Sequence, residues 1–558
     1  MSHWESIRPR RRATAWPANT RHTLTTAEFA DDMDTAMPRR STLYRFIMGI
    51  DSTFAEMTPS EISALGDPMA QLLKDAQLLK DGAFPLTVDA LLTELNTRSV
   101  LPEQSSFLIS EAGQIPPART AAANIAAVNI AAAARDMRFA IVRSRSSHAD
   151  LLISTSAVGD PQTVFLQVAA WDEQAELFNY YMRLGDTWIW AGNSYHALAP
   201  PSRGNGPFDS HINGSLVMKE LKQPWMNWQS QNATILLDEN DPLRQNILYQ
   251  SLSGAENLES IVRDGVARWT AARLKHAMTA DGRVRHVDWL LRQLCTTTTV
   301  NLTSSTTTST VAVADQAATL PLPLSFWLNN DSLIDGLNIS LRDDFVPPVV
   351  ARTLYADSLV RYDFALTQGE FTQKGDTFFA FVVPEAAFED IDVVNQMVRS
   401  GILSARFAAS VLMVDFPNPV FSETRAKLFR YVPTEAKLDS AGGGLSQQIA
   451  DAITASADSQ RAGTPEAEFR ANWELADSDW REVFAARIEK YLTCVSTRIA
   501  TAQGFDDYVR LAESRRREFK AMRLNEFSLT LPVTNIPPKA PLLQMQPDGT
   551  VREKLRAE

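Results

Sequence analysis

Cysteine is scarce in this chain of 558 residues, and its scarcity excludes several kinds of site. The two cysteines, Cys295 and Cys494, each lie among apolar residues with helical spacing. No cysteine pair has the spacing of a zinc ribbon or an iron–sulfur cluster. The run P-F-D-S-H matches the register of a covalent heme motif, but Pro207 and Ser210 replace its two thiols. We therefore expect free thiols in a reducing compartment.

Long apolar runs are also missing. No stretch approaches the eighteen or so apolar residues of a membrane-spanning helix. The first residues, MSHWESIRPRRRATAWPAN, carry a basic region with no apolar stretch after it. That pattern differs from a standard secretory signal. The sequence therefore predicts no membrane span and a cytoplasmic location.

Positive charge is in deficit. The chain has 54 Lys and Arg against 66 Asp and Glu, a net charge of −12. An acidic protein is poorly suited to nucleic acid or to an anionic membrane surface. The one basic cluster, Arg8, Arg10, Arg11 and Arg12, lies in a polar N-terminal arm, and we interpret it as part of a solvated tail. We predict no nucleic-acid partner.

Motifs that identify a cofactor are absent from the sequence. It contains neither a P-loop pattern nor the glycine pattern of dinucleotide-binding folds. It also lacks the H-E-x-x-H, G-x-S-x-G and EF-hand patterns. The cofactor, if there is one, is unknown from the sequence. Hydrophobic residues at 45% and charged residues at 22% are ordinary for a globular protein.

The spacing of apolar residues predicts an α+β protein with a helical N-terminal part, a strand-rich centre and a helical C-terminal part. In the centre we predict a β-hairpin that leads into a long ordered loop. The predicted parts are an arm (1–40), a helical part (41–137), a mixed α/β domain (138–436), a helical part (437–527) and an extended tail (528–558).

Several elements carry clear local signals. Thr58 to Glu61 fits a capping box with proline at the first helical position, and Asp67-Pro68 offers a second helix start. Strands are predicted at 138–143, 150–155, 163–168, 177–183, 187–191 and 377–383, and an extended threonine-rich strand at 296–310. Helices are predicted at 60–80, 85–97, 118–137, 255–278, 284–294, 388–400, 404–414, 479–502 and 506–522.

Residues 183–232 have the most unusual composition in the chain. They hold four of the twelve Trp, two of the seven His and five of the twenty-three Gly. Stacking surfaces, closely approaching backbone and a few polar groups are what a ligand pocket needs. The tryptophans Trp188, Trp190, Trp225 and Trp228 would form the walls of a pocket for a sugar, an aromatic group or a cation.

The polar centre of this segment allows two kinds of chemistry. In one, His211 is a general acid or base oriented by Asp209. In the other, His211 and His196 bind a metal together with Asp209 or Glu220, although the spacing matches no known template. Two further residues of the segment, Arg203 and Lys219, would anchor an anion. The competing interpretation is an ordered loop packed over a core.

Our leading hypothesis is a soluble enzyme of unknown reaction that acts on a small, sugar-like or aromatic ligand in a pocket around residues 188–228. The alternative is a non-catalytic binding or assembly protein that uses the same segment as a partner or glycan surface. The C-terminal helices would then mediate homo-oligomer formation. A concave site where His211 and Asp209 converge favours the enzyme, whereas His211 directed at backbone favours binding.

Overall fold

A computed structural model of the chain describes residues 43–74, 84–110, 113, 137–146, 148–217, 227–231, 234–303, 319–368, 371–374, 381–438, 444–522 and 531–554. These belong to one unit, residues 39–558. The predicted arm, residues 1–40, and nearly all of the alanine-rich helix predicted at 118–137 lie outside the described residues.

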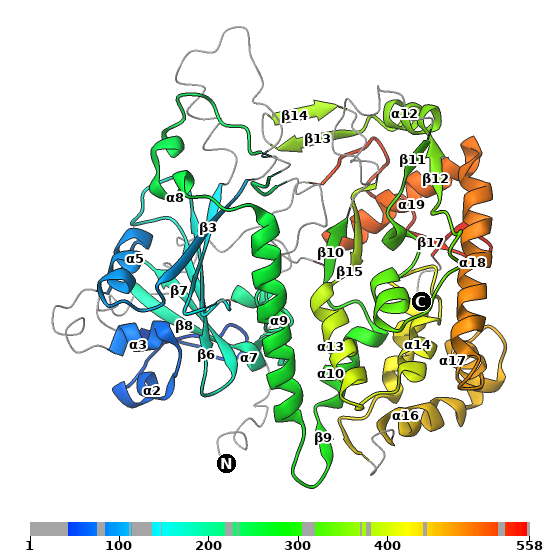
Figure 1. Ribbon diagram of the computed structural model, residues 1–558, viewed down its shortest axis with the longest axis horizontal. Helices are drawn as coiled ribbons and strands as arrows, with labels where there is room; N and C mark the ends of the chain where they lie inside the picture. The colour runs from blue at the N-terminus through cyan, green and yellow to red at the C-terminus, as the bar shows by residue number, and fades with distance from the viewer. Residues whose placement is uncertain are drawn as a thin grey trace. The chain divides into compact units, whose positions relative to one another are not determined.

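An eight-stranded sheet organises the first half of the described chain (Figure 1). Six consecutive strands form an antiparallel meander, β1 pairs in parallel with β8, and β2 closes that edge. The predicted hairpin is confirmed as β7 and β8, with Leu184 opposite Thr187. The strands are β1 (Leu43–Arg45), β2 (Ala55–Glu56), β3 (Glu103–Ile109), β4 (Arg138–Ser144), β5 (Leu151–Ser156), β6 (Leu166–Asp172), β7 (Leu177–Leu184) and β8 (Thr187–Asn193).

Short helices and one long helix accompany the sheet. The capping box is confirmed, since Thr58 and Glu61 bond each other's backbone N–H at the start of α2. The second start at Asp67-Pro68 is also confirmed, because a new helix begins at Pro68. The helices are α2 (Pro59–Ala64), α3 (Pro68–Lys74), α5 (Val88–Thr97), α7 (Ser194–Leu198), α8 (Ile247–Gln250) and α9 (Ala255–Ala277), with 3-10 turns at Gly206–Asp209 and Pro242–Gln245.

The described part of the second half is mainly helical and contains five two-stranded sheets. Its helices are α10 (Val287–Cys295), α12 (Arg352–Arg361), α13 (Phe388–Arg399), α14 (Ala405–Leu412), α15 (Glu423–Ala426), α16 (Gly444–Thr454), α17 (Pro465–Trp473), α18 (Trp480–Ile499) and α19 (Ala502–Ala521). A π-helix, η4, spans Asp331–Gly336. The strand pairs are β10 (Val300–Thr303) with β15 (Val383–Ala386), β11 (Thr319–Pro321) with β12 (Val349–Ala351), β13 (Ala365–Gln368) with β14 (Phe371–Lys374), β16 (Glu435–Lys437) with β9 (Arg283–Arg285), and β17 (Leu543–Met545) with β18 (Val551–Glu553).

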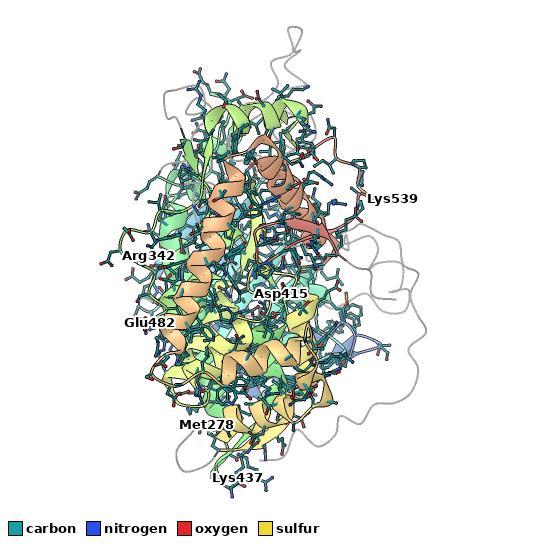
Figure 2. The ribbon with its side chains drawn as sticks, turned by 90° about the vertical axis from the view of Figure 1, so that its right-hand side faces the viewer. Met278, Arg342, Asp415, Lys437, Glu482 and Lys539 are labelled. Carbon is teal, nitrogen blue, oxygen red and sulfur yellow. The ribbon has the colours of Figure 1, made fainter. Side chains whose placement is uncertain are left out.

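Two hydrophobic cores meet along α9. The sheet core takes buried residues from Leu43 to Ala272. The helical core takes buried residues from Leu274 to Met545. After α9 the chain turns at Met278 and continues into β9. β9 pairs with β16, in which Lys437 lies opposite Arg283. Met278 and Lys437 are labelled at the lower end of the molecule in Figure 2. One helix therefore contributes buried side chains to both cores.

The fold class is α+β, as predicted. The part predicted to be helical, residues 41–137, also supplies three strands, β1, β2 and β3. Apolar residues of β1 and β3 pack into the sheet core, and the exposed β2 pairs with β1. Of the threonine-rich run, Val300–Thr303 is a strand and residues 304–310 lie outside the described part. Among the described helices, none has both the length and the hydropathy that crossing a bilayer requires.

Candidate functional site

The predicted tryptophan walls lie in the sheet core. Trp188 is 0% exposed, and its indole N–H donates to the carbonyl oxygen of Pro85 at 3.0 Å. Trp190 is also buried and donates to Asn179 Oδ1 at 2.9 Å. Trp228 is buried beside β3, where it forms an isolated bridge with Ile109. These three indoles therefore stabilise the core; Trp225 and Lys219 lie outside the described residues.

A buried polar network fixes Trp190 in place. Its acceptor Asn179 donates to Asp67 Oδ2 at 2.8 Å, and the hydroxyl of Tyr181 donates to the same oxygen at 2.6 Å. The other carboxyl oxygen of Asp67 accepts the backbone N–H of Ala70 at 2.9 Å. Burial nevertheless raises the pKa of Asp67 to about 6. The network joins β7, β8 and α3.

The two predicted histidines have local structural partners. His196 Nδ1 accepts the backbone N–H of Asn193 at 3.2 Å at the start of α7, and burial lowers its pKa to about 4. His211 Nδ1 lies 2.8 Å from the carbonyl oxygen of Ser215, and its ring centroid is 4.9 Å from that of Tyr180. Among the described residues, no group of three His, Cys, Asp or Glu is placed to hold a metal ion.

Asp209 and Arg203 occupy partly buried positions in the loop. Burial raises the pKa of Asp209 to about 7, against the opposing effect of hydrogen bonds with Ser210. Burial lowers the pKa of Arg203 to about 10; the nearby Arg292 lowers it further and Asp390 opposes the shift. Asp209 therefore exchanges protons near neutral pH, and Arg203 remains a cation.

The end of the loop fastens the sheet to the helices at Asn213. Its carbonyl oxygen accepts the indole N–H of Trp269 at 2.9 Å, and its side-chain oxygen accepts Arg273 Nη1 at 3.0 Å. Its amide nitrogen donates to Asp390 Oδ1 on α13 at 3.1 Å. A single asparagine thus links the loop to α9 and α13.

Gly214 makes this junction sterically feasible. Its φ is +76°, and a Cβ placed there would lie 2.5 Å from the carbonyl oxygen of Ser194. Ser194 Oγ in turn donates to the carbonyl oxygen of Gly214 at 2.6 Å. Only glycine tolerates both the left-handed backbone and this close approach. The density of glycine and tryptophan in this segment thus also serves close packing.

A hydrogen-bonded chain of three side chains begins inside the same segment, at Tyr195. The hydroxyl of Tyr195 lies 2.9 Å from His276 Nδ1, at the end of α9. His276 Nε2 lies 3.0 Å from Glu176 Oε2, in the turn between β6 and β7. We call these three residues the relay. A carboxylate only accepts hydrogen bonds, so the neutral imidazole carries its proton on Nε2 and accepts the phenol proton at Nδ1.

The surroundings of the relay define its charge. Glu176 also accepts a hydrogen bond from Lys275 Nζ at 2.8 Å. This bond, and to a smaller extent the contact with His276, lowers the pKa of the Glu176 carboxyl group. Burial raises the pKa of Tyr195 to about 12, while the nearby charge of Arg273 works in the opposite direction. The phenol therefore holds its proton in the resting protein, next to a cation that favours the phenolate.

Backbone geometry places the relay residues. Glu176 has a φ of +53°, uncommon for a non-glycine residue, and its carboxylate contacts Lys275 and His276 of α9. Tyr195 packs edge-on against Trp269 of α9, with centroids 5.2 Å apart. Strained backbone next to an ordered side-chain chain is typical of functional sites.

Sequence reasoning did not identify the relay. Tyr195 and His276 are 81 positions apart along the chain, and Glu176 and His276 are farther apart still. No local motif connects a turn, a short helix and the end of a long helix. The one signal available in the sequence is Tyr195, which directly precedes His196, a predicted ligand-binding residue. Comparison with models of known protein families, with curated proteins and with solved structures finds no match to this chain.

Proposed function

We propose that the chain is an enzyme that transfers a proton to or from a small-molecule substrate at Tyr195. The observation that carries the proposal is the continuous Glu176–His276–Tyr195 relay, with 3.0 and 2.9 Å between its members. A reacting hydroxyl, a base within hydrogen-bond reach and a third group that orients the base form the usual arrangement of an activated side chain. The proposal keeps the ligand class and the cytoplasmic location expected from the sequence.

The proposed step moves two protons together. The substrate proton passes to the oxygen of Tyr195 as the phenol proton passes to His276 Nδ1. The substrate becomes its conjugate base, and the imidazolium is stabilised by Glu176, its hydrogen-bond partner at 3.0 Å. Reversal of both transfers restores the phenol. The positive charge of Arg273 near Tyr195 favours the phenolate character of the transition state.

The activation of Tyr195 is tested without knowing the substrate. An arylsulfonyl fluoride labels a tyrosine when the phenol oxygen displaces fluoride, and mass spectrometry assigns the site. We expect Tyr195 to be labelled faster than the partly buried Tyr44 and Tyr249 of the same molecule. General-base assistance contributes roughly 100-fold or more.

Variants of the relay identify the cause of the reactivity. His276→Asn and Glu176→Gln should slow the labelling of Tyr195, the first by about 100-fold. The matched control is His286→Asn, which changes a histidine stacked on Trp289 at 4.5 Å, outside the relay. Labelling of Tyr195 at the rate of the reference tyrosines, or equal rates in wild type and His276→Asn, would contradict the proposal.

We keep Asp209 and His211, the pair expected from the sequence, in the proposal as a second proton-transfer pair. The pKa of Asp209 near 7 supports this part of the proposal. Once a substrate is found, unchanged turnover and binding in a folded His211→Ala variant would remove the pair from the mechanism.

A non-catalytic binding or assembly protein is the second candidate, and the contact of His211 Nδ1 with the carbonyl oxygen of Ser215 favours it. In that case the loop packs over the core and the C-terminal helices mediate oligomer formation. Tyr195 would then show no enhanced labelling, and sedimentation would give a stable oligomer.

A further inference from the structure

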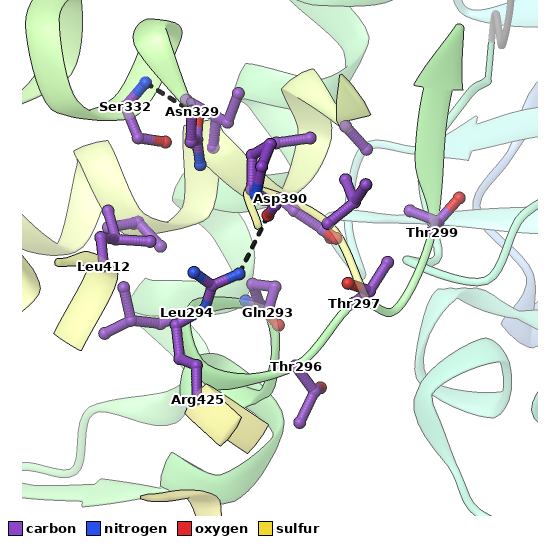
Figure 3. Close-up of a pocket in the computed structure, with 16 residues that line it drawn as sticks. Gln293, Leu294, Thr296, Thr297, Thr299, Asn329, Ser332, Asp390, Leu412 and Arg425 are labelled. Carbon is purple, nitrogen blue, oxygen red and sulfur yellow. Dashed lines mark hydrogen bonds between the residues drawn. The ribbon is translucent and has the colours of Figure 1, made fainter. Parts of the chain in front are cut away.

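A small polar cavity lies in the helical half, among residues that do not belong to the relay (Figure 3). Its volume is about 30 Å³. A buried water needs roughly 10–15 Å³, so the cavity has room for a group of two or three heavy atoms. The wall residues used below are Thr297, Asn329, Ala386, Asp390 and Arg425.

Arg425 gives this cavity a positive charge. In Figure 3 its guanidinium extends from α15 into the middle of the labelled residues. The side chain is buried, at 5% exposure, and its hydrogen bonds go to the carbonyl oxygens of Val414, Asn418 and Pro419. Among the described residues, its hydrogen bonds thus go to uncharged carbonyl oxygens. Asp415 and Glu468 influence its pKa only through the longer-range field.

The donors of Arg425 are only partly used. A guanidinium carries five N–H groups, and the three hydrogen bonds to carbonyl oxygens occupy three of them. Thr297 adds a hydroxyl proton, because its oxygen accepts the backbone N–H of Phe421 at 2.8 Å and the proton stays available. The wall therefore offers several donors to one acceptor group.

The corner that surrounds Arg425 is held in an unusual conformation. Asp415 and Phe421 both have left-handed backbone, with φ of +52° and +57°. The side chain of Asp415 accepts Asn418 Nδ2 at 2.7 Å and the hydroxyl of Ser422 at 2.6 Å. These bonds hold the carbonyl oxygens of the corner around the guanidinium. Left-handed non-glycine residues are costly and often mark a binding site.

The one carboxylate of the wall, Asp390, forms hydrogen bonds with residues other than Arg425. Its Oδ1 accepts Asn213 at 3.1 Å and its Oδ2 accepts Thr298 at 2.6 Å. Arg203 and Arg273 both lie within its electrostatic range. Its negative charge is thus partly compensated by these two arginines. Arg425 and the N-terminus of α13 favour an anion in the cavity.

From this arrangement we propose that the cavity binds one carboxylate group, either a free formate or acetate ion or the carboxylate of a small ligand. A carboxylate has three heavy atoms, which matches the volume, and it accepts the charge-assisted hydrogen bonds that Arg425 and Thr297 offer. A tetrahedral phosphate or sulfate has five heavy atoms and exceeds the space. This site is independent of the relay, with which it shares no residue.

Titration with sodium acetate and sodium formate tests the site, with sodium chloride at equal ionic strength as the reference. The thermal midpoint of the full chain should rise with carboxylate concentration and saturate, because a ligand that binds the folded state stabilises it. Arg425→Gln should weaken binding by about tenfold or more. The exposed Arg399→Gln on α13 should bind as the wild type does.

A second variant keeps the test valid if Arg425→Gln does not fold. Ala386→Val adds two methyl groups at the wall and should abolish the acetate response. Its control, Ala351→Val, changes the last residue of β12, which also precedes a helix but lies outside the cavity. Equal effects of acetate and chloride on the wild type, or an unchanged acetate response in Ala386→Val, would overturn the proposal. Saturable binding of phosphate or sulfate that depends on Arg425 and exceeds acetate would overturn the carboxylate assignment.

Discussion

The buried carboxyl group of Asp67 should make the stability of the sheet core depend on pH. Burial raises its pKa from 3.8 to about 6 in the folded state. The folded state therefore binds a proton more tightly than the unfolded chain does. The contribution of this group is fully present below about pH 4 and is lost as the pH rises through about 6. A shift of about two pKa units corresponds to about 3 kcal/mol.

The matching variant is Asp67→Asn, which removes the ionisation. Urea unfolding, followed by tryptophan fluorescence between about pH 4 and pH 7, gives the free energy of unfolding of both proteins. We expect the wild-type value minus the variant value to fall by about 2 kcal/mol over this range, most of the full effect. Groups that do not interact with Asp67 cancel in the difference.

Tyr181→Phe provides a second check on the same carboxyl group. The hydroxyl donates to Asp67 at 2.6 Å and holds its pKa down. Its loss should move the pH-dependent range above about 6. A difference between wild type and Asp67→Asn that stays constant with pH would refute the reasoning, because Asp67 would then ionise equally in both states.

Two further substitutions test the junction at the end of the loop. Gly214→Ala places a Cβ 2.5 Å from the carbonyl oxygen of Ser194 and should destabilise the protein by about 2 kcal/mol or more. The control is Gly185→Ala, at a position with φ +54° and open space around it, which should destabilise the protein by about 1 kcal/mol. Similar melting temperatures of the two variants would show that the close approach is unimportant. Asn213→Ala removes a hydrogen bond from both Arg273 and Asp390 and should cost about 3 kcal/mol, measured by urea unfolding. Asn205→Ala, at an exposed position, is its control, and equal losses would argue against the junction.

Local signals allowed part of the fold to be predicted. The hairpin of β7 and β8 depends on a short turn at Gly185 between two apolar strands, and the start of α2 depends on side chains three residues apart. Such features are determined by neighbours in the sequence. The participation of β1 in the sheet, in contrast, requires Leu43 to pair with Trp188 from far along the chain, and no local pattern indicates that pairing.

The candidate site was less predictable for a physical reason. A segment rich in tryptophan, glycine and polar residues suits a ligand pocket, and it equally suits a tight junction in a core. Trp188 needs an acceptor for its N–H, and Gly214 permits close approach, in either setting. Only the burial of each side chain in the folded protein distinguishes a ligand pocket from a tight junction in the core. The relay of Tyr195, His276 and Glu176 depends on how α9 packs, which is a property of the folded chain.

The sharing of α9 between two cores has a consequence for how the protein can be divided. A fragment that ends before Ala255 would lose Leu258, Val262 and Trp269 from the sheet core. A fragment that begins after Ala277 would keep the helical core without the helix against which α13 packs, including the bond from Gln396 to the carbonyl oxygen of Ala267. Neither fragment buries its own apolar surface. The two halves should therefore be expressed, studied and recombined only with α9 attached.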